Sequence, residues 1–190
     1  ALKGLPYDTV PVDLVAGEQG GEAHAALNPQ RLVPALVTDD GVLTQSLAIL
    51  EWLDDTHPEP PLLPRDPAGR AKVRAMAAIV ACDIHPLNNL RVLKALAGLG
   101  ADEAARTAWA AGWIADGFRA LEPMVARHGA GWAYGEAPTL ADCCLVPQIY
   151  SAARFAVDMT SYPTLRAIAE RAAEHPAFQA AHPDRQPDAR

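Results

Sequence analysis

The stretch from residue 28 to 53 constrains the fold more than any other part of the chain. Within it, two short apolar runs, 32–37 and 42–44, flank an Asp-Asp-Gly sequence at 39–41. An Asp-Gly pair between two such runs is the strongest short-range signal for a β-hairpin. Apolar residues at helical spacing then follow Ser46, which lies where a helix N-cap belongs. The stretch therefore predicts a strand, a turn, a second strand and a capped helix.

Two polar features of this stretch suggest a ligand. Pro34 cannot donate a ladder hydrogen bond, so the peptide groups of Val33 are free to pair with something other than the sheet. The helix that begins near Gln45 and Ser46 offers unpaired N–H groups and the positive end of its dipole, which suit a carboxylate. Together they predict a site for a small peptide with a free carboxylate. The alternative is that Pro34 only ends a strand and Ser46 only caps a helix.

The rest of the chain divides by composition into two regions of unlike class. Residues 7–14 alternate in polarity and predict an edge strand, because Pro11 excludes a central one. Residues 22–27 predict a short helix or turn, and the Pro-rich residues 58–67 predict a linker. Helical patterns follow at 69–96, 101–127, 139–149, 163–173 and 176–181. We therefore expect an α/β domain over 1–57 and an all-helical domain over 68–190.

Local signals refine the helical region. Pro86 predicts an interruption near 83–86. Thr139 and Asp142 have the spacing of a capping box, ahead of a helix that is apolar all round and is therefore expected to be buried. Cys143 and Cys144 on this helix are expected to be inert core residues. Cys82 precedes His85 by three residues, but a nucleophilic pair there lacks a third, orienting group.

Composition excludes several classes of function. The 190 residues are 50% hydrophobic and 21% charged, as in an ordinary globular protein. A net charge of −7 without a Lys/Arg run argues against a nucleic-acid partner. The three cysteines show neither a disulfide framework nor a metal-ligand spacing, which fits a reducing compartment and no metal site. No run approaches the ~20 apolar residues that span a bilayer, so we expect a cytoplasmic protein without a membrane partner.

Several pairs and short motifs resemble a known family. The pairs Asn28-Pro29, Val33-Pro34 and Gln45-Ser46 resemble the glutathione-binding half of cytosolic glutathione transferases. Further on, the sequence at 83–91 resembles that of the zeta class, as do Ala153-Arg154-Phe155, Asp158 and Tyr162-Pro163. Members of that class are maleylacetoacetate and maleylpyruvate isomerases. The resemblance covers nearly the whole chain.

This resemblance implies a thioredoxin-like domain followed by an all-helical domain, glutathione as cofactor, a maleyl keto acid as substrate and a homodimer. In such proteins the proline of the Val-Pro pair is cis. Arg154 and Arg91 are implied as catalytic residues, since a guanidinium pairs with the carboxylate of a keto acid through two hydrogen bonds. The implied glutathione-binding residues are Gln19, Val33, Pro34, Gln45, Ser46, His85 and Asn89.

The sequence departs from the family at its beginning. In the family, a first, central strand leads to a Ser or Cys that activates the glutathione thiolate, and no residue here matches either. We therefore expect about 15–20 further residues upstream, the length of a strand, a loop and a helical turn. An intact mass of 20.2 kDa would contradict this expectation. Two alternatives stay open: a transferase acting on small halogenated acids, and a non-catalytic binding protein if the chain truly starts at Ala1.

Overall fold

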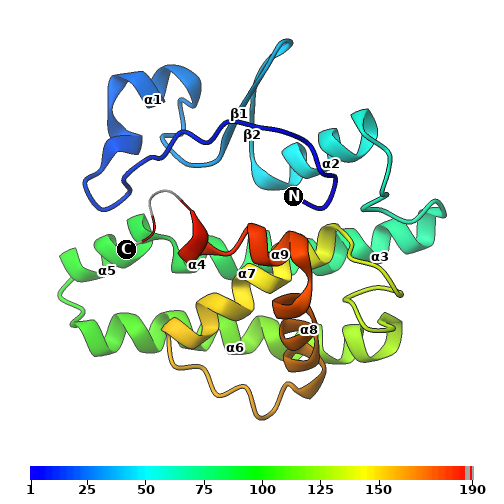
Figure 1. Ribbon diagram of the computed structural model, residues 1–190. Coiled ribbons are helices and arrows are strands. Elements are labelled where there is room, and N and C mark those ends of the chain that lie inside the picture. Colours follow the sequence, from blue (N-terminus) through cyan, green and yellow to red (C-terminus); the bar gives the residue numbers. More distant parts are fainter. Residues whose placement is uncertain (187–188, 190) are drawn as a thin grey trace. The chain divides into compact units, whose positions relative to one another are not determined.

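The computed structural model describes residues 1–186 and 189, which group into two compact units (Figure 1). The first unit comprises Ala1–Pro60 and Pro176–Arg190, and the second comprises Pro61–His175. The boundary at residues 60 and 61 lies inside the expected linker, 58–67. The closing segment groups with the first unit, whereas the sequence placed it in the helical region.

The first unit contains the expected hairpin. Strands β1 (Ala35–Thr38) and β2 (Gly41–Thr44) pair antiparallel, with Ala35 opposite Thr44 and Thr38 opposite Gly41. Gly41 has a φ of 126°, a conformation that L side chains rarely adopt, which explains the glycine of the Asp-Asp-Gly turn. The first strand begins just after Pro34 rather than at residue 32, because proline has no N–H for the ladder.

In the sequence, the helices of the first unit lie before and after this hairpin. They are η1 (Glu18–Gly20), α1 (Glu22–Leu27), α2 (Ser46–Thr56), α9 (Pro176–Ala180) and η3 (Pro183–Arg185). The prediction that Ser46 is the N-cap of α2 is wrong by one residue. Gln45 is the N-cap, with a φ of 70°, and no side-chain capping bond is present. The chain therefore turns from β2 into α2 at Gln45, one residue earlier than a Ser signal suggests.

The prediction of an edge strand over residues 7–14 is wrong. This segment forms no regular element, and among the described residues β1 and β2 pair only with each other. Alternating polarity suits a strand, but a strand exists only when a neighbouring backbone completes its hydrogen bonds. Residues 7–14 have no such neighbour in the part of the chain that the structure describes, so they stay outside the β1–β2 ladder.

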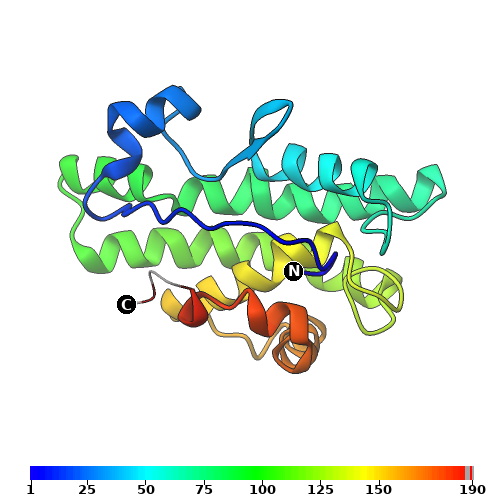
Figure 2. The same ribbon diagram turned by 45° about the horizontal axis from the view of Figure 1, so that its top comes forward.

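The second unit is helical, with an interruption where Pro86 predicted one. The chain runs through α3 (Pro67–Ala78), a π-helical segment η2 (Ile79–Ile84), α4 (His85–Asn88) and α5 (Leu90–Gly98). It then continues through α6 (Glu103–His128), α7 (Leu140–Arg154) and α8 (Pro163–Glu174). Figures 1 and 2 show the run from α3 to α5 lying alongside α6, consistent with contacts of η2, α4 and α5 with α6.

Helix α7 lies at the centre of the second unit and packs against α3, η2, α6 and α8. Its buried residues include Leu140, Leu145 and Ile149, as expected for a helix that is apolar all round. The predicted capping box of Thr139 and Asp142 is present at its start. Among the described residues, no helix combines the length and the apolar character needed to cross a membrane.

Candidate functional site

The open end of the hairpin gathers four of the five predicted ligand-binding residues of the first unit. The Val33–Pro34 peptide bond is cis, as the family resemblance implies. Because Ala35 pairs with Thr44, Pro34 and Gln45 are the next residues outward on the two strands. Val33, Pro34, Gln45 and Ser46, separated by up to thirteen positions in sequence, therefore meet at one edge of the hairpin.

This edge offers hydrogen-bonding groups that the protein itself does not use. Val33 is 42% exposed, and neither its N–H nor its C=O takes part in a hydrogen bond within the described chain. Ser46 is the first residue of α2, so its N–H and those of the next residues point out of the helix without intrahelical partners. An extended peptide can pair with Val33 while its carboxylate is held at the start of α2.

Gln45 differs from an ordinary N-cap. Its backbone φ of 70° is uncommon for a residue other than glycine, and such strained residues concentrate at functional sites. Its side-chain Nε2 donates a hydrogen bond of 2.6 Å to Oε1 of Gln30. Gln19, the remaining predicted residue of this unit, lies on η1, and its Oε1 is buried without a hydrogen-bond partner among the described residues.

In the second unit, three predicted residues lie around the break between α4 and α5. His85 is the first residue of α4, and desolvation lowers its pKa from its ordinary value, which favours the neutral ring. Asn89 caps α5, because its Oδ1 accepts a hydrogen bond of 3.1 Å from the N–H of Arg91. The structure therefore gives Asn89 a structural role that the sequence did not foresee. Both amide atoms of its neighbour Asn88 are buried without partners within the described chain.

The two predicted catalytic arginines are exposed. Arg91 lies in the first turn of α5, and Arg154 is the last residue of α7. Within residues 1–186 and 189, neither forms an ion pair or a side-chain hydrogen bond. Both guanidinium groups are therefore available to an anionic ligand. Most exposed arginines are equally free, so availability alone does not assign a role.

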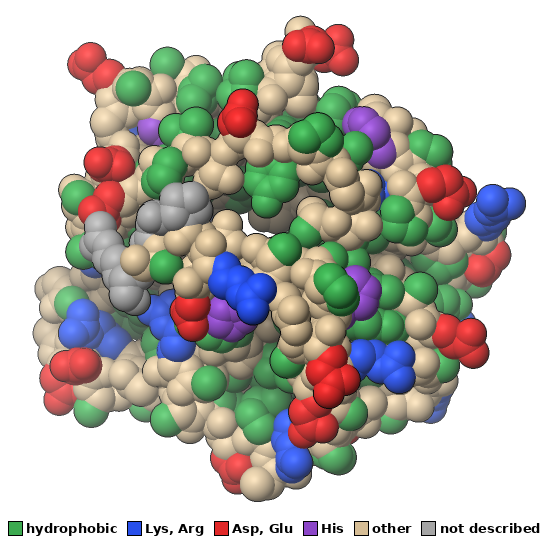
Figure 3. Space-filling view, in the orientation of Figure 1, with side chains coloured by type: hydrophobic (Ala, Val, Ile, Leu, Met, Phe, Trp, Pro, Cys, Tyr) green, Lys and Arg blue, Asp and Glu red, His purple; other side chains and the backbone are tan. Residues whose placement is uncertain are grey.

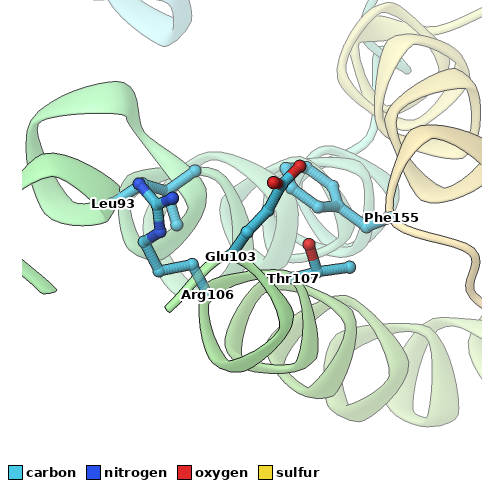
Figure 4. Close-up of a pocket in the computed structure, with 5 residues that line it drawn as sticks. All are labelled: Leu93, Glu103, Arg106, Thr107 and Phe155. Atoms are coloured by element: carbon cyan, nitrogen blue, oxygen red, sulfur yellow. The ribbon is translucent and has the colours of Figure 1, made fainter. Parts of the chain in front are cut away.

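A small pocket is lined by residues close in sequence to both arginines. Its volume is about 130 Å³, and Leu93 of α5 and Phe155, just after α7, both line it (Figure 4). Glu103, Arg106 and Thr107 of α6 complete the lining. Residues two apart on a helix face different sides, so Arg91 does not share the pocket face of Leu93. At well below the ~300 Å³ of typical ligand pockets, this pocket is too small for a tripeptide.

A space-filling view (Figure 3) shows how the charged side chains are distributed over one face of the molecule. In the lower half of the face drawn in Figure 3, Asp and Glu side chains are mixed with Lys and Arg side chains, whereas the upper part shows mainly Asp and Glu. A nucleic-acid site needs a basic patch or stripe. No such patch appears on this face.

Comparison with known proteins places these features in a family. The family model of the glutathione S-transferase N-terminal domain matches residues 1–56. A maleylpyruvate isomerase from a Ralstonia species is 52% identical over 98% of this chain and 90% of its own length. The holo structure of a zeta-class maleylpyruvate isomerase matches 100% of this chain and 91% of that chain, with a TM-score of 0.97 and 52% identity. The chain belongs to the zeta class of glutathione transferases.

A further zeta-class relative shows what such a site holds. The maleylacetoacetate isomerase of Anaeromyxobacter dehalogenans is 49% identical, with a TM-score of 0.89 over 100% of this chain and 84% of that one. Its active site contains dicarboxyethyl glutathione and citrate. The predicted fold class, a thioredoxin-like domain followed by an all-helical domain, is confirmed by these structural matches.

Two features of this zeta-class chain were not predicted from its sequence. The positive φ of the Gln45 backbone has no compositional signal, because such a φ is normally taken by glycine. The hydrogen bond between Gln30 and Gln45 joins residues that lie fifteen positions apart. Only the three-dimensional course of the 28–35 segment brings them together.

The cysteines of the second unit give a direct test of burial. Cys143 and Cys144 are half-buried rather than fully buried as predicted, yet burial still raises the pKa of their thiols to about 12, whereas Cys82 on η2 is exposed. At pH 8, the reactive thiolate of the first two is then on the order of 10⁻⁴ of the total. Iodoacetamide at pH 8 should therefore label the native protein at Cys82 alone, as measured by peptide mass spectrometry. Fast labelling of the native Cys82→Ser variant would contradict this.

Proposed function

We propose that the protein catalyses the glutathione-dependent cis–trans isomerisation of a maleyl keto acid, maleylacetoacetate or maleylpyruvate, to its fumaryl isomer in the catabolism of aromatic compounds. The observation that carries this proposal is the 52% identity to the Ralstonia maleylpyruvate isomerase over 98% of the chain. The dicarboxyethyl glutathione held by the Anaeromyxobacter relative supports it, because that ligand carries two carboxylates attached to glutathione.

The residues at the open end of the hairpin fit glutathione. The free peptide groups of Val33 pair with the backbone of an extended tripeptide. The start of α2 at Ser46 holds the carboxylate of the γ-glutamyl end, and Gln45 contributes its side-chain amide. Gln19, His85 and Asn89 are proposed as further contacts. Bound glutathione supplies the thiolate that adds to the cis double bond and leaves again after rotation about the resulting single bond.

Arg154 and Arg91 are proposed to act on the substrate. A maleyl keto acid carries carboxylates, and negative charge spreads onto its carbonyl group when a nucleophile adds to the conjugated double bond. A fixed guanidinium binds the carboxylate through paired hydrogen bonds and stabilises that developing charge. The protein therefore contributes orientation and electrostatic stabilisation rather than a nucleophile of its own.

The decisive experiment measures turnover at limiting glutathione. With maleylpyruvate or maleylacetoacetate in large excess, the protein should convert all substrate to the fumaryl isomer while free glutathione stays constant. Stoichiometric loss of glutathione would contradict the isomerase proposal and favour the conjugating alternative. A parallel assay with a chlorinated acid, in which chloride release is measured, tests the dehalogenating alternative directly.

Replacing Arg154 with methionine should lower kcat/KM for the maleyl substrate by about 10- to 100-fold, the value of a charged hydrogen bond to a carboxylate. Steady-state kinetics should show little change in the KM for glutathione, which Arg154 is not proposed to bind. Arg127→Met is the matched control, since Arg127 is an exposed arginine in the last turn of α6. Equal losses in both variants would show that net charge, not a contact, is responsible.

We also propose that the protein works as a homodimer in the cytoplasm, as the family resemblance implies. Sedimentation equilibrium of the purified protein tests the first part, and a mass equal to that of one chain would contradict it. Cell fractionation tests the second part.

A further inference from the structure

The hydrogen bond between Gln30 and Gln45 gives a role to a residue that no motif marked. Nε2 of Gln45 donates to Oε1 of Gln30 at 2.6 Å, and both side chains are exposed at the open end of the hairpin. A carboxamide has one donating end and one accepting end. With Nε2 engaged by Gln30, Gln45 presents its acceptor, Oε1, for which no hydrogen bond is present among the described residues.

Gln30 lies on a turn that is firmly anchored. Asn28, only 2% exposed, accepts a hydrogen bond from the N–H of Gln30 at 3.0 Å through Oδ1. Its Nδ2 donates to the C=O of Leu32 at 2.7 Å, and its own C=O accepts from the N–H of Arg31 at 2.8 Å. A buried side chain therefore determines the course of the turn. Gln30 extends from a backbone whose position is set before any ligand arrives.

The other partner is equally constrained. The backbone of Gln45 is held at a φ of 70° between the last residue of β2 and the first residue of α2. The pairing of Ala35 with Thr44 keeps Gln45 beside Pro34, and hence near the free peptide groups of Val33. Oε1 of Gln45, which does not bond to Gln30, thus belongs to the edge of the hairpin where an extended peptide is proposed to bind.

We infer that Gln30 is a positioning residue that acts through Gln45. It orients the Gln45 amide so that Oε1 accepts from an N–H donor of the ligand, which selects a γ-glutamyl end with a free α-ammonium group. This inference rests on the proposed binding of glutathione at the hairpin. It concerns recognition of one end of the cofactor and leaves the chemical step unchanged.

The first test compares three proteins: wild type, Gln30→Met and Gln30→Glu. Methionine keeps the length of the side chain but accepts poorly from Nε2, whereas a glutamate carboxylate still accepts. Gln30→Met should weaken glutathione binding and raise its KM by about 3- to 10-fold, the value of one ordinary hydrogen bond. Gln30→Glu should restore the wild-type values, and kcat at saturating glutathione should stay constant in both variants.

A glutathione analogue without the α-ammonium group, glutaryl-cysteinyl-glycine, supplies a second readout. Wild type and Gln30→Glu should bind glutathione more tightly than this analogue in calorimetric titrations. Gln30→Met should lose most of that preference. A merely structural role for Gln30 would weaken both ligands equally, and that result would overturn the inference.

A double-mutant cycle tests whether the effect passes through Gln45. Gln45→Met should weaken glutathione binding, and adding Gln30→Met to it should cause no further loss. Additive losses, or an effect of Gln30→Met without one of Gln45→Met, would overturn the inference. Calorimetry keeps this result separate from the proposed function: a protein that binds glutathione as expected but does not isomerise maleyl substrates refutes only the isomerase activity.

Discussion

Replacing Lys3 with methionine should destabilise the first unit by about 3–5 kcal/mol, the usual cost of removing one member of a buried ion pair. Lys3 and Asp54 form such a pair, with 2.9 Å between Nζ and Oδ1 and side-chain exposures of 5% and 8%. The Lys3 ammonium also donates to the C=O of His57 at 2.6 Å and to the C=O of Pro60 at 2.8 Å. The Lys3 ammonium group thus connects the start of the chain to the end of α2 and to the residues after it.

The measurement is hydrogen exchange of the α2 amides together with urea-induced unfolding. In Lys3→Met, the Asp54 carboxylate keeps its burial and loses this cation, so α2 should exchange much faster than in wild type. Arg119→Met is the matched control, because the pair of Arg119 with Asp116 has a similar distance, 2.8 Å, but exposures of 71% and 60%. That control should cost less than about 1 kcal/mol. Similar effects of the two substitutions would show that burial of the Lys3 pair is unimportant.

This pair is a contact that the sequence could not reveal. Lys3 and Asp54 lie fifty-one positions apart, and nothing in the pattern around either residue indicates a buried charge. By contrast, the β1–β2 hairpin and the capping box of α7 were predictable, since an Asp-Gly turn or a Thr-x-x-Asp spacing determines its structure within a few residues. Signals of that kind report local geometry. A contact between residues far apart in the sequence, such as that of Lys3 with Asp54, has no local pattern from which it could be predicted.

The features of the candidate site also fall into two groups: those that follow from local sequence and those that depend on residues far apart in the chain. The ladder starts only at Ala35 because Pro34 has no N–H, and this local property leaves Val33 outside the hairpin ladder. The orientation of the Gln45 amide depends on Gln30, on the Asn28 turn and on a positive φ that carries no residue signal. The interruption before α5 was predictable from Pro86. The π-helical form of η2 was not predicted from the sequence, whereas the capping of α5 by Asn89 is a local feature, because asparagine is a favoured N-cap residue.

Replacing Asp142 with asparagine should destabilise the second unit by about 3–5 kcal/mol, the sum of a lost charged hydrogen bond and a buried donor left unpaired. Asp142 is fully buried, and this burial raises the pKa of its carboxyl above the ordinary value, although the hydrogen bonds from Ala133 and Thr139 act in the opposite direction. Oδ1 accepts from the N–H of Ala133 at 2.7 Å. Oδ2 accepts from the N–H of Thr139 at 2.8 Å and from its hydroxyl at 2.9 Å.

An asparagine cannot reproduce this arrangement in either orientation, because its NH₂ group then faces the N–H of Ala133 or that of Thr139. The matched control is Asp102→Asn, at the exposed N-cap of α6, where Oδ1 accepts from the N–H of Ala105 at 2.8 Å. Asparagine and aspartate cap helices about equally well, so this control should change stability by less than about 0.5 kcal/mol. Urea unfolding of both variants separates the two roles. A small effect at both sites would contradict the prediction. A large effect at Asp142 alone would show that its contribution comes from the bonds of both carboxylate oxygens, to Ala133 and to Thr139, and exceeds that of an exposed cap.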